Sequence, residues 1–430
     1  MVTTKRGLVL GTTAAVLSTV AVTGAGVRLS QSQAFFQDSP KEIVDEVWQI
    51  INHEYVDTSF NQLDWQKIRK DYLGRSYSGK EDAYKAIREM VEKLGDPYTR
   101  FMDPEEFRNM QIDTSGELTG VGIQIAKDEE TDQLMVIAPI EDTPAFEAGI
   151  LAKDIITKID GKSTEGMDVN EAVKLIRGQP GTTVTLTIQR QGRQVDYQLA
   201  RARIQIHPVK ARTENTSIGK VGYIRLNQFS AQASKEMREA IQNLEKEQVE
   251  GYVLDLRSNP GGLLYSSIDI ARMWLERGTI VSTVDRGGER ERRAANHNAL
   301  TEKPLVVLID GGSASASEIL SGALQDNERA VLVGTQTFGK GLVQSVRSLG
   351  DGSGLAVTIA KYLTPSGRDI NKHGIDPDIV IELSEAEQKK LQQDRTLIGS
   401  QQDPQFVKAL EILSGEVKAQ QGSDARAMGQ

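Results

Sequence analysis

Residues Gly311 to Glu318 read GGSASASE, and this stretch decides which fold the sequence predicts. It follows the apolar run LVVLI (Leu305 to Ile309), which indicates a buried strand, and it precedes ILSGALQ, which indicates a helix. Small residues between a strand and a helix allow a tight turn that presents a serine, as at the nucleophile elbows of hydrolases. Because a serine hydroxyl is a weak nucleophile until a base removes its proton, the stretch raises the question of where that base lies.

Strands and helices alternate around this turn. From about Val209 the chain reads GKVGYIRL, helical SKEMREAIQNLEKE and then GYVLDL, which predicts an α/β core with strands that are at least partly parallel. Residues 38 to about 110 have helical periodicity instead, and nothing in their sequence indicates chemistry. Between the two, from about Gly116, short runs of strand type predict a compact β module of about 90 residues.

The composition excludes several classes of protein. A chain of 430 residues is too long for one ordinary core. The net charge is −9, and the arginine cluster RGGERERR (Arg286 to Arg293) includes two glutamates, so nucleic-acid binding is not expected. The absence of cysteine excludes disulfides and thiolate chemistry. The 4 histidines form neither HExxH nor HxH, so we expect no metal and no cofactor.

The N-terminus predicts export. Lys5 and Arg6 precede an uncharged run from Gly7 to Val27, and Ser32-Gln33-Ala34 then offers small residues before a cleavage point. This layout indicates a secretory signal over residues 1–34, and the alternative is a retained anchor that associates the protein with a membrane. The threonines and glycines of the run make it weakly apolar, which favours cleavage. In both cases we expect the body of the protein outside the cytoplasm.

Lysine is the remaining common base, and the candidate is Lys340 in TFGKG (Thr337 to Gly341). A lysine acts as a base only when it is neutral, so its pKa must fall from about 10.4 to ~7–8, which burial in an apolar pocket can cause. The two glycines beside it allow other parts of the chain to approach closely. Gln344 lies four residues on, so on a strand it would share a face with Lys340 and could fix the amine without adding charge.

Taken together, these motifs resemble those of the carboxyl-terminal processing peptidases, also called tail-specific proteases. The resemblance covers nearly the whole chain after the signal and rests on NPGGLL (Asn259 to Leu264), GGSASASEI (Gly311 to Ile319), FGKGLVQ (Phe338 to Gln344), and TPSG with GIDPD (Thr364 to Asp378). It implies an α/β core of the crotonase-like type with an inserted PDZ-like β module and a helical N-terminal lead-in. We expect a helical domain at 35–112, a PDZ-like domain at 113–203, a catalytic core at 204–385, and C-terminal helices and a tail at 386–430.

The resemblance also implies a serine endopeptidase with a serine/lysine dyad. The middle serine of SASAS, Ser315, would be the nucleophile, and Lys340 would be the general base, supported by Gln344. The oxyanion hole would consist of the backbone N–H groups of Ala316 and of Gly261 in the NPGG turn.

Other interpretations of the serine turn remain open. Ser313 and Ser317 are alternative nucleophiles that spacing does not exclude, so the choice of Ser315 rests on the resemblance. The pattern Ser315-x-x-Glu318 is also that of a helix capping box. The two roles are compatible, because a helix N-terminus also favours a developing oxyanion.

The base has alternatives as well. By itself Lys340 would be interpreted as a solvated surface lysine. His297 or His373 is a second candidate, although a serine/histidine site also needs a carboxylate that orients the histidine, and Asp376 is the acid nearest to His373 in sequence.

The β module contains TGVGI (Thr119 to Ile123), which resembles the carboxylate-binding loop of PDZ domains. The resemblance implies that a peptide adds as a strand along GIQI beside a helix at Asn170 to Ile176, while backbone N–H groups hold its terminal carboxylate. Arg177 resembles an arginine that couples PDZ position to the active site in some relatives, and its alternative role is to bind carbonyls at the helix end. A purely structural β domain is the other interpretation. The expected carboxylate-binding residues are Gly120, Val121, Gly122 and Ile123.

The expected partners are proteins with exposed apolar C-termini. The segment Trp48 to Gln66 resembles the cyanobacterial and chloroplast branch, whose members trim a photosystem II reaction-centre precursor in the thylakoid lumen; a paralogue in periplasmic quality control is the alternative. A non-catalytic PDZ scaffold would not need the set Ser315, Lys340 and Gln344. Acyl-thioester chemistry on the crotonase-like core is disfavoured by export and by the lack of a nucleotide-binding signature.

Overall fold

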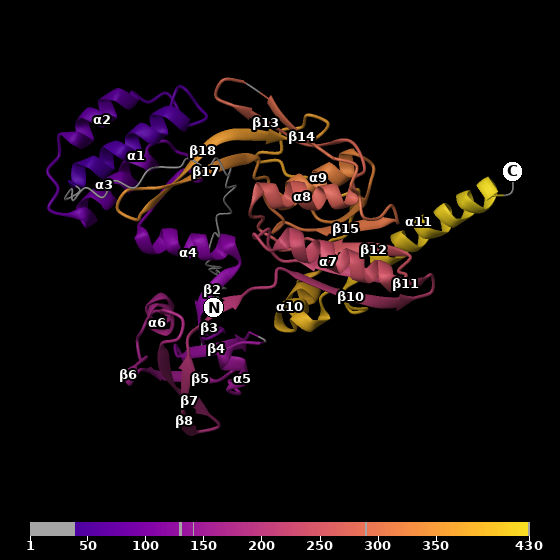
Figure 1. The fold of residues 1–430 in the computed structure, drawn as a ribbon, viewed down its shortest axis with the longest axis horizontal. Coiled ribbons are helices and arrows are strands. Elements are labelled where there is room, and N and C mark those ends of the chain that lie inside the picture. The colour runs from indigo at the N-terminus through magenta and orange to yellow at the C-terminus, as the bar shows by residue number, and fades with distance from the viewer. Residues whose placement is uncertain (1–38, 129–130, 141, 289, 429–430) are drawn as a thin grey trace, which may run out of the picture. The chain divides into compact units, whose positions relative to one another are not determined.

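The structure is a computed structural model that describes residues 39–428, except 129–130, 141 and 289. The expected signal segment, residues 1–34, lies outside the described residues. The chain divides into two compact units (Figure 1). One unit comprises the described residues up to Phe107, then Val209–Phe229 and the chain from Ala233 on, and the other comprises Arg108–Pro208 with Ser230–Gln232. In the part of the chain that the structure describes, no helix combines the length and the apolar character of a membrane span.

The centre of the first unit is a sheet of six strands in the order β10-β11-β12-β15-β16-β19. The strands from β11 to β19 are parallel, and β10 is antiparallel to β11. Strands β12 and β15 are buried along their whole length, which accounts for the apolar run of β15 and for Tyr252, Val253 and Leu254 of β12. The bounds are β10 Val209–Thr216, β11 Gly219–Leu226, β12 Gly251–Asp255, β15 Leu305–Ile309, β16 Val331–Gly334 and β19 Ile379–Val380.

Helices cover both faces of this sheet (Figure 1). Successive side chains of a strand point to opposite faces. Accordingly, Leu254 of β12 contacts the core formed with α7, α8 and α9, whereas its neighbour Val253 contacts the core formed with α11. The helices are α7 Ala233–Lys246, α8 Leu264–Trp274, α9 Ala316–Asp326 and α11 Pro404–Met428, and the short helices α10 Glu385–Gln393 and η1 Arg395–Leu397 precede α11.

A second sheet connects the N-terminal helices to this core. It contains β1 Arg100–Met102, β13 Thr279–Asp285, β14 Arg290–Ala294, β17 Leu342–Ser348 and β18 Gly354–Leu363. Helices α1 Pro40–Glu54, α2 Trp65–Leu73 and α3 Lys80–Glu92 pack against Leu355 and Val357 of β18. Because β1 also pairs with β18, the helical lead-in shares one compact unit with the α/β core.

The second unit is built on a β sheet with the strand order β3-β4-β5-β7-β8, and β6 pairs with β5. Strands β2 Glu117–Gly120 and β9 Ala202–Gln205 form a separate ribbon, which leaves β3 at an edge of the sheet. The remaining elements are α4 Pro104–Ser115, β3 Ile123–Lys127, β4 Leu134–Pro139, α5 Pro144–Glu147, β5 Ile155–Ile159, β6 Lys162–Ser163, α6 Val169–Ile176, β7 Thr183–Arg190 and β8 Arg193–Ala200.

A buried ion-pair cluster joins the end of β12 to the start of α11. The Arg257 guanidinium donates hydrogen bonds to the carboxylates of Asp255 (2.6 Å) and Asp403 (2.7 Å). Both carboxylates are fully buried. Burial alone would lower the pKa of Arg257, but the two carboxylates outweigh burial and raise this pKa well above its ordinary value. The loss of one partner therefore leaves an uncompensated charge in the interior.

We expect Asp403→Ala to lower the free energy of unfolding by about 3–5 kcal/mol, because Arg257 loses a buried partner. The matched control is Glu411→Ala, which removes a surface pair with Lys408 and should cost about 0–1 kcal/mol. Melting temperatures from circular dichroism measure the difference. Equal melting temperatures for the two variants would show that Asp403 contributes no more than a surface charge.

Candidate active site

Ser315 occupies the sharp turn between β15 and α9. Its backbone has φ 54° and ψ −110°, a conformation that is strained for any residue with a side chain. Strain of this kind is typical of a nucleophile elbow. Ala316 is the first residue of α9, so its N–H has no carbonyl partner within the helix and lies at the positive end of the helix dipole.

The two neighbouring serines brace this turn. The Ser313 hydroxyl donates to the carbonyl of Leu256 (2.8 Å), and the Ser317 hydroxyl donates to the carbonyl of Asn259 (2.8 Å). Both side chains are 0% exposed, whereas Ser315 is 5% exposed. These structural bonds favour Ser315 among the three serines, a choice that spacing alone left open.

The Glu318 carboxylate joins the serine turn to the loop that carries Lys340. One oxygen accepts the N–H groups of Ser315 (2.7 Å) and Lys340 (2.9 Å). The other accepts the N–H of Gly339 (2.7 Å) and the hydroxyl of Thr337 (2.6 Å). Burial raises the pKa of Glu318, and these hydrogen bonds oppose that increase. The capping pattern predicted the bond to the Ser315 N–H, but it did not predict the bonds to a loop about 20 residues further along the chain.

Tyr362 of β18 makes the complementary contacts, and no motif in the sequence predicted its part in the site. Its hydroxyl shares its single proton between the carbonyl oxygens of Ser315 (3.1 Å) and Lys340, and its side chain is buried. Glu318 therefore holds the N–H groups, and Tyr362 the carbonyl oxygens, of the same two residues. The serine and the lysine are fixed to each other through their backbones.

Lys340 is buried, contrary to its interpretation as a solvated lysine. Burial lowers its pKa to about 8; the positive charge of Arg100 adds to the decrease, while Glu318 and Asp96 oppose it. The ring of Tyr98 lies over the amine, with its centroid 4.8 Å from Nζ. The direction and size of this shift agree with what a neutral lysine base requires.

The glycines beside Lys340 allow the close approach that the sequence predicted. A Cβ on Gly341 would lie 2.7 Å from the backbone nitrogen of Asn371, and one on Gly339 would lie 3.0 Å from that of His373. Gln344 is buried on β17, with its Nε2 3.5 Å from the hydroxyl of Thr358. Strand β17 begins only at Leu342 and its pairing is irregular before Gln344, so a shared strand face does not describe how Gln344 and Lys340 are related.

The NPGG turn lies directly against the serine turn. A Cβ on Gly261 (φ 101°) would lie 2.6 Å from the carbonyl oxygen of Ala314 and 2.9 Å from the nitrogen of Ala316, so only glycine fits there. The Gly261 N–H donates to the side-chain oxygen of Asn259 (2.9 Å). Both expected oxyanion donors are thus close to Ser315, but one of them already has a partner.

The two histidine candidates lie in other surroundings. His297 is exposed and faces Glu276 (3.2 Å), and His373 is exposed. The carboxylate of Asp376 accepts a hydrogen bond from Gln336 (2.8 Å). The hydrogen bonds of Glu318 connect the Ser315 turn to the loop of Lys340, which favours lysine over either histidine as the base.

In the second unit, the TGVGI loop leads into the edge strand β3. A Cβ on Gly122 (φ 84°) would lie 2.2 Å from the hydroxyl of Thr143, so this turn requires glycine, and the Val121 carbonyl accepts the N–H of Ala145 (2.9 Å). Partly buried apolar side chains follow on both β3 and α6: Ile123, Ile125, Val169 and Leu175. An edge strand beside an apolar helix is the arrangement that accepts a peptide as an added strand.

The side chain of Arg177 donates to the side-chain oxygen of Asn109 (2.5 Å). The carbonyls at the end of α6, those of Leu175 and Ile176, are bound by Arg201 instead (2.8 Å each). The role of helix-end cation, which the sequence offered as the alternative for Arg177, thus belongs to Arg201.

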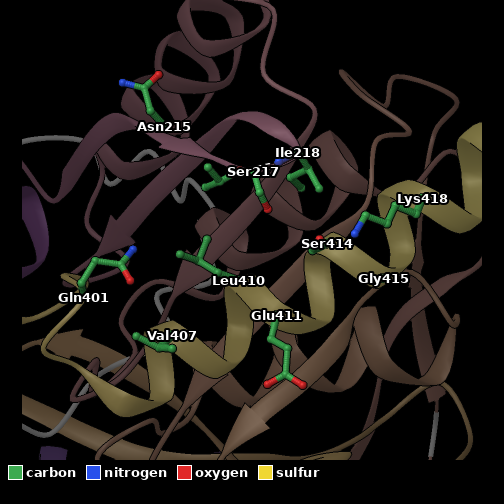
Figure 2. A pocket seen from close by; sticks show the side chains of 11 residues that line it. Asn215, Ser217, Ile218, Gln401, Val407, Leu410, Glu411, Ser414, Gly415 and Lys418 are labelled. Atoms are coloured by element: carbon green, nitrogen blue, oxygen red, sulfur yellow. Dashed lines mark hydrogen bonds between the residues drawn. The ribbon is translucent and has the colours of Figure 1, made fainter.

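A separate depression of about 580 Å³ lies in the first unit between the β10–β11 turn and α11 (Figure 2). Figure 2 shows Ser217 and Ile218 on one side and Leu410, Ser414 and Lys418 of α11 on the other. It is lined by none of the residues that surround Ser315, so the chemistry predicted from the sequence does not involve it.

Comparison with known proteins identifies the class. Residues 220–381 match the peptidase family S41, and residues 135–190 match the PDZ domain. The chain is 47% identical over 383 residues to the carboxyl-terminal-processing protease of Synechocystis sp., covering 88% of this chain and 87% of that protein. It is 41% identical over 345 residues to the chloroplastic carboxyl-terminal-processing peptidase 2 of Arabidopsis thaliana, covering 77% and 67%.

Among solved structures, one described as a photosystem II D1 C-terminal processing protease is similar with a TM-score of 0.57 and 36% identity, over 86% of this chain and 99% of that chain. An α/β peptidase core with a PDZ domain is therefore the architecture, and the protein is a serine peptidase. The chain belongs to the carboxyl-terminal processing peptidases of family S41. The family and the fold class that the motifs predicted are confirmed.

We expect Glu318→Gln to lower the cleavage rate about 100-fold, since a small displacement of reacting groups has an effect of that order. The amide turns an N–H₂ group toward N–H donors, and each buried donor left unpaired costs about 1–3 kcal/mol. Cleavage rate and melting temperature measure both effects. Glu239→Gln, on the exposed surface of α7, is the control that should change neither. A Glu318→Gln enzyme with the wild-type rate would show that the carboxylate does not hold the two loops in register.

Proposed function

We propose that this chain is a serine endopeptidase in which Ser315 and Lys340 form the dyad, and that it removes C-terminal segments from exported proteins whose apolar C-termini bind the PDZ domain. The observation that carries the proposal is the double connection of a strained serine to a buried lysine through Glu318 and Tyr362. A lysine whose pKa falls to about 8 by burial can act as a base near neutral pH.

In the proposed mechanism, neutral Lys340 removes the hydroxyl proton of Ser315 while the serine oxygen attacks the scissile carbonyl carbon. The Ala316 N–H, at the positive end of α9, stabilises the resulting oxyanion. The Gly261 N–H joins it by exchanging the Asn259 oxygen for the oxyanion. The Lys340 ammonium then protonates the leaving amine, which releases the C-terminal fragment. The neutral amine finally activates water, which hydrolyses the acyl-enzyme.

Recognition is proposed to start at the free C-terminus. The peptide adds to β3 as an antiparallel strand, its carboxylate binds backbone N–H groups of the loop at Gly120, Val121, Gly122 and Ile123, and its apolar side chains contact α6. Arg177 directly follows α6 and contacts Asn109 of α4, so a movement of α6 on peptide binding is transmitted to α4 through this contact. This coupling is part of the proposal.

The natural substrate is proposed from the relatives. Cyanobacterial and chloroplast processing proteases, and a solved structure named for photosystem II D1, are among the similar proteins. We infer that a photosystem II reaction-centre precursor is the first candidate substrate and that the enzyme acts in the thylakoid lumen after export by residues 1–34. Periplasmic quality control of proteins with apolar tails is the second candidate, and a retained N-terminal segment would hold the enzyme at the membrane.

The first experiment mixes the chain from residue 35 onward with an unstructured protein that ends in apolar residues. We expect wild type to cleave it, Ser315→Ala to leave it intact, and amidation of the substrate C-terminus to slow the reaction, with mass spectrometry identifying the products. Ser317→Ala is the matched control, because it removes the alternative nucleophile of the same turn; the loss of its bond to Asn259 should slow cleavage without abolishing it.

Cleavage that survives Ser315→Ala would overturn the dyad. Equal cleavage of free and amidated tails would overturn recognition of the C-terminus. Binding of the tail without cleavage by the wild type would favour the non-catalytic scaffold.

The pH dependence gives a second test. Because only neutral Lys340 is a base, kcat/KM should rise with pH through an apparent pKa of about 8 and fall about tenfold per pH unit well below it. Lys340→Arg should be inactive at every pH, because arginine stays protonated. Its melting temperature reports whether the fold is kept. A rate that does not change between pH 6 and 9, or an active arginine variant, would contradict a lysine base.

A further inference from the structure

The stretch from Gly95 to Arg100, which follows α3 and enters β1, borders the candidate base, although nothing in its sequence indicated chemistry. Its residues Asp96, Tyr98 and Arg100 all act on Lys340. Tyr98 lies over the amine, and the two charged side chains shift its pKa in opposite directions. The N-terminal helical module therefore contributes side chains to the surroundings of the candidate base.

A series of hydrogen bonds leads from the half-buried Asp96 of this stretch to the buried Gln344. The hydroxyls of Thr358 and Thr99 both donate to the same carboxylate oxygen of Asp96 (2.7 Å each). The backbone N–H of Thr358 donates to the hydroxyl of Thr99 (3.0 Å). The amide nitrogen of Gln344 lies 3.5 Å from the hydroxyl of Thr358, at the outer limit of a hydrogen bond. Thr99, Thr358 and Gln344 are each at most 3% exposed.

The hydrogen bonds of this series can run in only one direction, from Gln344 through Thr358 to Asp96. A carboxylate accepts hydrogen bonds and a hydroxyl has a single proton to donate. Because Thr358 gives its proton to Asp96, its oxygen can only accept a hydrogen bond from Gln344. Gln344 must therefore turn its N–H₂ group toward Thr358, and its carbonyl oxygen faces the other way.

The direction matters for a lysine base. A neutral amine has two N–H donors and one lone pair, and the lone pair must stay free for the serine proton. A glutamine that presents its carbonyl can hold one N–H of the amine and leave the lone pair available. A glutamine turned the other way would donate to the lone pair and block the base.

We propose that Asp96 is a positioning residue for the base: through the Thr358 hydroxyl it fixes the orientation of the Gln344 amide, so that the carbonyl of Gln344 holds the Lys340 amine with its lone pair toward Ser315. This inference rests on the proposed dyad. It makes a segment of the helical lead-in part of the catalytic apparatus, and it gives Gln344 a role that a shared strand face does not explain.

The test compares kcat and KM of Asp96→Asn, Thr358→Val and Thr358→Ser on the apolar-tailed substrate. Thr358→Val keeps the shape of the side chain and removes the hydroxyl, whereas Thr358→Ser keeps the hydroxyl. We expect Asp96→Asn and Thr358→Val to lower kcat about 10–100-fold at unchanged KM, the order expected for a misplaced catalytic group, and Thr358→Ser to retain the wild-type rate. Asp82→Asn is the matched control, because its carboxylate also accepts from a hydroxyl, that of Ser78, on the helical lead-in (2.7 Å).

The double variant and the pH profile separate positioning from general damage. If both residues act through the Gln344 amide, adding Asp96→Asn to Thr358→Val causes no further decrease in kcat. The groups that shift the Lys340 pKa are Arg100, Glu318 and Asp96. Asp96→Asn removes a negative charge, so the rise of kcat/KM should move to lower pH although kcat falls. Thr358→Val removes no charge and should leave the apparent pKa where it is.

Several results would overturn the inference. If the wild type cleaves, the inference is overturned by a Thr358→Val enzyme with the wild-type kcat or by a Thr358→Ser enzyme as slow as Thr358→Val. It is also overturned if the decreases in kcat of the two single variants add in the double variant. A wild type that cleaves nothing would overturn the proposed function and this inference with it. The two failures are therefore distinguishable.

Discussion

The arrangement of the site depends on one buried carboxylate. Glu318 accepts hydrogen bonds from the N–H groups of Ser315, Gly339 and Lys340, which lie on two separate loops. In an interior from which water is excluded, each of those donors would be costly to leave unpaired, so the carboxylate keeps both loops in one register. Tyr362 reinforces the same connection from the carbonyl side. These bonds fix the backbone of Ser315 relative to that of Lys340.

The same site balances charge around the amine. Burial and Arg100 lower the pKa of Lys340, while Glu318 and Asp96 limit the decrease, and the result is about 8. A value in this range suits the proposed role, in which the amine first removes a proton from Ser315 and then gives it to the leaving amine. A lysine buried without the two carboxylates would be a weaker base, and an exposed lysine would stay protonated.

The supporting structure extends beyond the motifs. Asn259, fully buried at the NPGG turn, donates to the carbonyl of Leu226 and accepts the Gly261 N–H, while its own carbonyl accepts the Ser317 hydroxyl. Two residues earlier, Arg257 connects the end of β12 to Asp403 at the start of α11. The C-terminal helix and the N-terminal segment around Asp96 therefore both belong to the framework of the site, although each lies outside the span from NPGG to FGKG.

Local patterns in the sequence determined the α/β core, the PDZ-like module, the serine turn and the lysine loop, because apolar periodicity and required glycines act over a few residues. The family resemblance then singled out Ser315 and Lys340. The tertiary structure added the bonds by which Ser313 and Ser317 brace the serine turn, the contacts of Glu318 with the lysine loop, and the contacts of Tyr362 and Asp96. Asp96 and its partner Thr358 are 262 residues apart, and no local pattern records such a contact. Only the folded chain brings those groups together, because burial and pairing of strands, not neighbouring sequence, decide which side chains share a site.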